Sequence, residues 1–81
     1  MYTTKMLIDV VTVQTESILG VENTKSTAEF LMYRKLSEII STYSDYISNI
    51  AQIFDSKDCK KGYDVTLKSG DTIIIMIKKE G

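Results

Sequence analysis

The sequence predicts a small α+β protein: an N-terminal helix or strand, a long central amphipathic helix over residues 26–54, and a C-terminal β-hairpin over 63–68 and 72–79. Two observations predict this arrangement. Through the middle of the chain, apolar residues recur at the spacing of one helix face. Near the C-terminus, apolar and polar residues alternate on either side of a glycine-containing turn, as in paired strands. The 81 residues are expected to form a single small domain.

The N-terminal segment, residues 4–19, allows two interpretations. The β-branched residues over 8–13 favour a strand. The lack of strict alternation favours a helix, as does a row of polar residues from Lys5 to Glu16 that would share one side of a helical wheel. Gly20 follows at the position where a helix cap would be needed. We expect a helix over 4–19, with a strand as the alternative.

The central helix is predicted to begin at Ser26, because Ser26 and Glu29 have the spacing of a capping box. An apolar stripe then continues to residue 54 without interruption, with the width expected of a helix that faces a core. The stripe has two rows, Tyr33, Leu36, Ile40, Tyr43, Ile47, Ile50 and Phe54 in one and Met32, Ile39, Tyr46 and Ile53 in the other.

The C-terminal hairpin is predicted from alternation over 63–68, a turn that contains Gly70, and a second apolar segment over 72–79. Residues 73–77 are all apolar, so both faces of this last strand are expected to be covered.

The sequence offers little chemistry for catalysis. It has no histidine, its glycines are isolated, and Cys59 is its one cysteine. Asp55, Asp58 and Asp64 do not have the spacing of a calcium loop. We therefore predict that the protein is not an enzyme and has no catalytic residues, no bound cofactor and no metal site.

Charge and hydropathy are those of an ordinary globular protein. The net charge is −1 and 43% of the residues are hydrophobic. No apolar segment is long enough to span a bilayer, and no secretion signal is visible. Together with the single cysteine, these features predict a cytoplasmic protein without a membrane partner.

The expected lengths predict self-association. A helix over 26–54 would be roughly 43 Å long, whereas strands of about seven residues span only about 23 Å. The uncovered part of the stripe should bind a second copy and another protein. We therefore expect a homodimeric protein-binding module, a regulator, adaptor or inhibitor of the kind that phages and mobile elements carry. The expected interface residues are Met32, Tyr33, Leu36, Ile39, Ile40, Tyr43, Tyr46 and Ile47.

An alternative rests on the stretch KLSEIISTYSDYISNIAQIF, which resembles the helix-turn-helix of small phage repressors. The resemblance implies a DNA-binding transcriptional regulator in which 45–54 is the recognition helix and the hairpin is a wing. It departs from that pattern because 45–54 contains no Arg or Lys, although phosphate contacts supply much of the affinity for DNA. The implied nucleic-acid contacts are Tyr46, Asn49, Gln52, Lys57, Lys60, Lys61 and Lys68.

Overall fold

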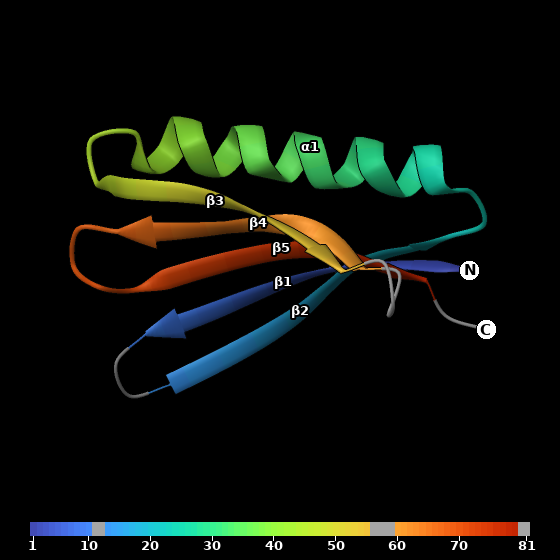
Figure 1. Cartoon of the computed structure of the whole chain (residues 1–81), viewed down its shortest axis with the longest axis horizontal. Helices are drawn as coiled ribbons and strands as arrows, with labels where there is room; N and C mark the ends of the chain where they lie inside the picture. Colours follow the sequence, from blue (N-terminus) through green and yellow to red (C-terminus); the bar gives the residue numbers. More distant parts are fainter. Residues whose placement is uncertain (11–12, 56–59, 80–81) are drawn as a thin grey trace.

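The computed structural model describes residues 1–10, 13–55 and 60–79, which form one antiparallel sheet of five strands and one helix (Figure 1). The strands lie side by side in the order β2-β1-β5-β4-β3, so the first and last strands of the chain are neighbours near the centre. In chain order the elements are β1 (Tyr2–Val10), β2 (Val13–Glu22), α1 (Lys25–Tyr43), β3 (Ile47–Asp55), β4 (Lys60–Leu67) and β5 (Thr72–Lys79).

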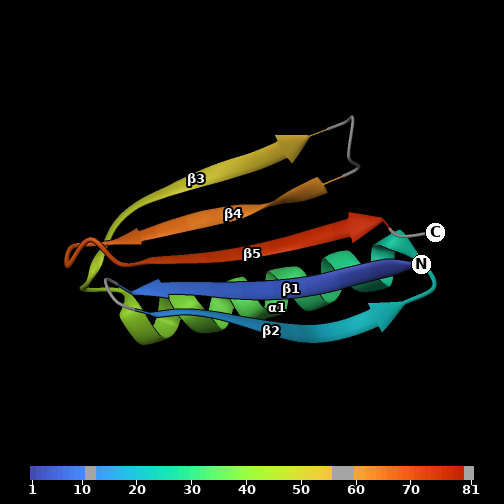
Figure 2. The same ribbon diagram turned by 90° about the horizontal axis from the view of Figure 1, so that it is seen from below.

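The helix covers only part of one face of the sheet. α1 packs mainly over β1, β2 and β5. Seen from the side of the sheet opposite the helix, β3 and β4 extend beyond α1, and no helix of the described chain lies on the near face (Figure 2). A five-stranded sheet is roughly 24 Å wide and a helix about 10 Å, so one helix cannot cover the whole face.

The core lies between α1 and the three strands at the centre of the sheet. Its fully buried side chains include Met32 from the helix and Ile75 from β5. In β5, alternate residues point to opposite faces, so Ile73, Ile75 and Ile77 face the helix and are buried. The other face of β5 is not covered by any described element, so the prediction that both of its faces are covered is wrong.

The predicted helix over 26–54 is wrong beyond Tyr43, because residues 47–55 form the edge strand β3. A bulge explains the misleading spacing. The register shifts between Ile47 and Asn49, so Ile47 and Ile50 face the same side of the sheet although they are three residues apart. The apolar positions of this irregular strand therefore have a three-residue spacing that is also typical of a helix.

The preferred helix over 4–19 is also wrong, since this segment contributes to the hairpin of β1 and β2. Strict alternation is absent because β1 is apolar on both faces: Met6 packs against the core, whereas Leu7 pairs with Ile74 on the other face. The polar row that suggested a helix includes Lys5 and Glu16, which instead form an ion pair across the hairpin at 3.4 Å.

The helix start and the C-terminal hairpin are closer to the prediction. α1 begins at Lys25, one residue before Ser26, and its cap is Thr24, whose Oγ1 accepts a hydrogen bond from the backbone N–H of Thr27 at 3.3 Å. The hairpin is present as β4 and β5, with β4 beginning at residue 60 and not at 63. The helix-turn-helix interpretation is wrong, because its recognition helix is the strand β3.

Candidate protein-binding surface

Large apolar side chains are exposed where α1 leaves the sheet uncovered. The strand register places Ile50 beside Val65 and Phe54 beside Lys61, on the face that carries the helix. Tyr33 borders the same region, because its ring centroid lies 6.2 Å from that of Tyr63 on β4. We call this surface the β3–β4 strip and define it by its exposed apolar residues, Tyr33, Ile40, Tyr43, Tyr46, Ile50 and Phe54.

The exposed fractions show that the strip lies at the surface and not in the core. Phe54 is 73% exposed and Tyr46 64%, and the other four side chains are between 37% and 41% exposed. A hollow of about 310 Å³ lies at the Tyr46 end, where Tyr43 and Leu67 also line it. A second hollow, of about 280 Å³, lies at the Phe54 end. The strip therefore runs along β3 between two hollows.

The strand that borders the strip is an edge strand of the sheet. β3 pairs only with β4 among the described strands, and residues 47–54 carry no charged side chain. The opposite edge, β2, carries Glu16 and Glu22. Charged residues on an edge discourage pairing with another chain, and their absence permits it. β3 is thus the edge better suited to accept a further strand.

A cluster of polar groups joins α1 to β4 beneath the strip. The Lys61 ammonium lies 5.8 Å from the centroid of the Tyr33 ring. A hydrogen bond with Tyr33 raises the pKa of Lys61, burial opposes this shift, and the charge of Glu29 adds to it. Burial is the main cause that raises the pKa of Tyr63, and its hydrogen bond with Tyr33 adds to it.

These pKa shifts predict weaker folding in alkali. A raised folded-state pKa contributes stability that is present below the ordinary values of 10.0 for Tyr63 and 10.5 for Lys61, and that is lost as pH rises through the raised values. We expect Tyr33→Phe to lose less thermal stability than the wild type between about pH 8 and about pH 11. Thermal unfolding followed by circular dichroism measures this difference. Tyr46→Phe serves as the control, and identical profiles for the two variants would contradict the prediction.

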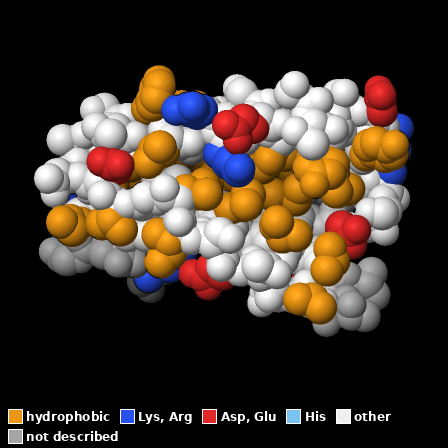
Figure 3. Space-filling view, turned by 180° about the vertical axis from the view of Figure 1, so that it is seen from behind, with side chains coloured by type: hydrophobic (Ala, Val, Ile, Leu, Met, Phe, Trp, Pro, Cys, Tyr) orange, Lys and Arg blue, Asp and Glu red, His pale blue; other side chains and the backbone are white. Residues whose placement is uncertain are grey.

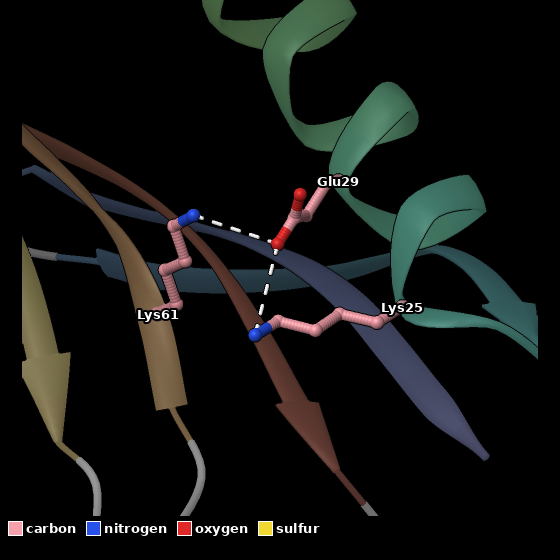
Figure 4. A network of polar contacts seen from close by, with 3 residues as sticks. All are labelled: Lys25, Glu29 and Lys61. Atoms are coloured by element: carbon pink, nitrogen blue, oxygen red, sulfur yellow. Dashed lines mark hydrogen bonds and ion pairs between the residues drawn. The ribbon is translucent and has the colours of Figure 1, made fainter.

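Glu29 connects the helix to the Phe54 end of the strip. Its Oε1 atom lies 3.5 Å from the Lys61 ammonium and 3.9 Å from that of Lys25, so one carboxylate is held between two lysines (Figure 4). Lys25 is the first residue of α1 and Lys61 belongs to β4, so the contacts connect the start of the helix to the sheet.

Hydrophobic side chains also reach the surface on the side of the molecule opposite to the view of Figure 1 (Figure 3). A hollow of about 200 Å³ opens there between the second half of α1 and strand β1, lined in part by Met6, Ile8 and Ile39. The ion pair of Lys35 with Glu38, at 3.2 Å, lies among its lining residues. This opening is smaller than either hollow of the strip and has a charged pair in its lining.

The eight residues predicted as an interface divide between core and surface. Met32 and Ile39 are buried within the chain itself, and Leu36 and Ile47 are half-buried against the core. Tyr33, Ile40, Tyr43 and Tyr46 belong to the β3–β4 strip. The interface prediction omitted Ile50 and Phe54, because a helix over 26–54 offered no reason to separate them from the rest of the stripe.

The residues implied as nucleic-acid contacts do not form one surface. Asn49 and Gln52 point to opposite faces of β3. Lys60 and Lys61 line the hollow at the Phe54 end. Tyr46 and Lys68 lie at the other end, where the Lys68 backbone N–H donates to the Tyr46 carbonyl at 2.7 Å. Lys57 lies outside the described residues.

Within the described ranges, no group of His, Cys, Asp and Glu side chains is arranged to hold a metal ion. In the same part of the chain, no helix combines the length and apolar character that a membrane crossing requires. No protein-family model, no curated protein and no solved structure matches this chain, so the β3–β4 strip carries the functional inference.

Proposed function

We propose that this chain is a non-catalytic protein-binding module that buries the β3–β4 strip against a partner. The observation that supports the proposal is the group of six large apolar side chains of α1, β3 and the turn between them, each at least 37% exposed, beside an edge strand that has no charged residue over 47–54. Contiguous apolar patches on soluble proteins commonly mark interaction sites. Burying one such side chain completely contributes about 1.5–3 kcal/mol, so a partner that covers several gains substantial affinity.

The first partner in this proposal is a second copy of the chain. A two-fold axis allows β3 to pair antiparallel with β3 of the other copy, because the same edge then meets itself. Residues 47–54 bring no like charges together in such a pair. With the two-fold axis at Ile50, the two Ile50 side chains would lie side by side on the helix-bearing face, and the two Phe54 side chains would lie on that face at opposite ends of the pair. As such a dimer, the chain would act on another protein as an adaptor, regulator or inhibitor.

The proposal places this module in the cytoplasm. One cysteine leaves no disulfide within the chain, and a small domain exported to an oxidising compartment commonly depends on disulfides.

Ile50→Lys is the variant that tests the proposal. Ile50 is 40% exposed at the middle of β3, so lysine is tolerated in the isolated chain but places two like charges near the two-fold axis. We expect the dimer dissociation constant to rise by roughly 30-fold or more, as for truncation of a central interface residue. Sedimentation equilibrium measures the constant, and circular dichroism confirms that the variant remains folded.

The matched control compares two phenylalanines. Phe54 in the strip is 73% exposed, and Phe30 on the outer side of α1 is 65% exposed. Phe54→Lys should weaken association, whereas Phe30→Lys should leave it unchanged. Equal effects of the two substitutions, or a wild-type chain that stays monomeric at high concentration, would refute dimerisation through the strip.

A further inference from the structure

The hollow at the Phe54 end of the strip is unusually rich in lysine. It is lined by Tyr2, Lys25, Phe54, Asp55, Lys60, Lys61, Ile77 and Lys79, and we call it the lysine hollow. The four lysines come from the first residue of α1, the first two residues of β4 and the last residue of β5. These elements meet here because β1, β4, β5 and the start of α1 share one end of the sheet (Figure 1).

Four lysines lie together at this hollow although the chain as a whole is slightly acidic. The chain has ten Lys and Arg residues and eleven Asp and Glu residues, with a net charge of −1. Four of the ten basic residues line the lysine hollow, and among the described residues of its lining Asp55 is the one acidic residue. With Glu29, which lies between Lys25 and Lys61, the described residues of the site carry four positive and two negative charges.

The Glu29 contacts show that these lysines can reach a shared carboxylate oxygen. Lys25 and Lys61 approach Glu29 Oε1 from different elements, at 3.9 and 3.5 Å. The side chain of Lys25 remains 63% exposed, so a further anion can reach it. The backbone N–H groups at the start of α1 add a partial positive charge at the same end of the helix.

From these observations we infer that the lysine hollow binds the carboxylates of an acidic segment of another protein. Its volume of about 280 Å³ is at the lower limit of small-molecule pockets, which suits one or two side chains better than a whole cofactor. Phe54 and Tyr2 supply apolar walls for the stems of glutamate side chains. Nucleic acid is less suitable, because the chain as a whole is slightly acidic and the basic residues line a confined hollow.

This inference goes beyond dimerisation and does not depend on it, because an acidic segment can enter the lysine hollow of a monomer. The probe is a blocked hexaglutamate peptide, titrated into isotope-labelled protein at low salt while backbone amide shifts are recorded. We expect the largest shifts at residues that line the lysine hollow. The dissociation constant should rise with added salt, because screening weakens exposed charge pairs.

Two lysine variants test the position of the site. Lys25→Gln and Lys79→Gln should each weaken hexaglutamate binding by roughly three-fold or more, as loss of one exposed charge contact predicts. Lys5→Gln is the control, since Lys5 is paired with Glu16 on the other face of the sheet. Uncharged hexaglutamine should produce no shifts in the lysine hollow.

Three outcomes would overturn the inference. The first is a set of hexaglutamate shifts that avoids the lysine hollow, and the second is equal weakening by Lys5→Gln and Lys79→Gln. The third is preference for another anion: inorganic phosphate or a short DNA duplex that binds in the lysine hollow more tightly than hexaglutamate would exclude the acidic protein segment. None of these outcomes depends on the oligomeric state, so failure here is distinguishable from failure of the dimer.

Discussion

Replacing Gly62 with alanine is expected to destabilise the fold strongly. An added Cβ would overlap the carbonyl oxygen of Ile75 and lie 2.8 Å from the Cα of Met76, both in the backbone of the neighbouring strand β5. Backbone atoms cannot move aside as a side chain can, so β4 and β5 must separate at the centre of the sheet. We expect a loss of about 3 kcal/mol or more in the free energy of unfolding, measured by urea denaturation.

Gly20 provides the matched control for this substitution. A Cβ at Gly20 would approach the Cδ1 atom of Leu31 at 2.8 Å, but this atom is the end of a side chain that can change rotamer. Gly20→Ala should therefore cost about 1 kcal/mol or less. If both alanine variants were equally stable, the close approach of β4 and β5 at Gly62 would be incorrect.

The sequence predicts those parts of the fold in which local chemistry and sheet register agree. The turn between β4 and β5 contains Gly70 with a φ of +92°, the conformation that glycine adopts most readily, and this hairpin is present as expected. In β3 the local sequence pattern and the sheet register disagree. The bulge after Ile47 arises from the pairing of β3 with β4, and no residue between 47 and 54 predicts it. Single-chain periodicity therefore favoured a helix.

The candidate site was predictable only in part, for a related reason. Tyr33 and Ile40 are on α1 and Tyr46 follows it, so the helix pattern identified them as apolar and available for association. Whether such a residue is buried depends on which strands the helix covers, and this is a consequence of strand order. Because β3 lies at the edge of the sheet beyond the strands that α1 covers, residues on its helix side stay exposed, whereas Val65 on the helix side of β4 is buried. Ile50 and Phe54 become surface residues for that reason alone.

Substitutions at two consecutive residues of α1 should have different effects, because one residue belongs to the core and the other to the β3–β4 strip. Met32 is fully buried, whereas Tyr33 is 41% exposed. Met32→Ala removes a buried side chain and leaves a cavity, so we expect the free energy of unfolding to fall by about 2–4 kcal/mol. Urea denaturation of the variant at low protein concentration measures this loss without a contribution from association.

Tyr33→Ala should weaken association strongly and folding only slightly. It removes the ring contact with Tyr63 and the proximity to Lys61, so the free energy of unfolding should fall by only about 1 kcal/mol. Its dimer dissociation constant should rise, because the same ring lies in the strip. A Tyr33→Ala variant that unfolds as readily as Met32→Ala would place Tyr33 in the core. A variant that keeps full stability and wild-type association would remove the helix side of the strip from the interface, and the partner would then contact β3 alone.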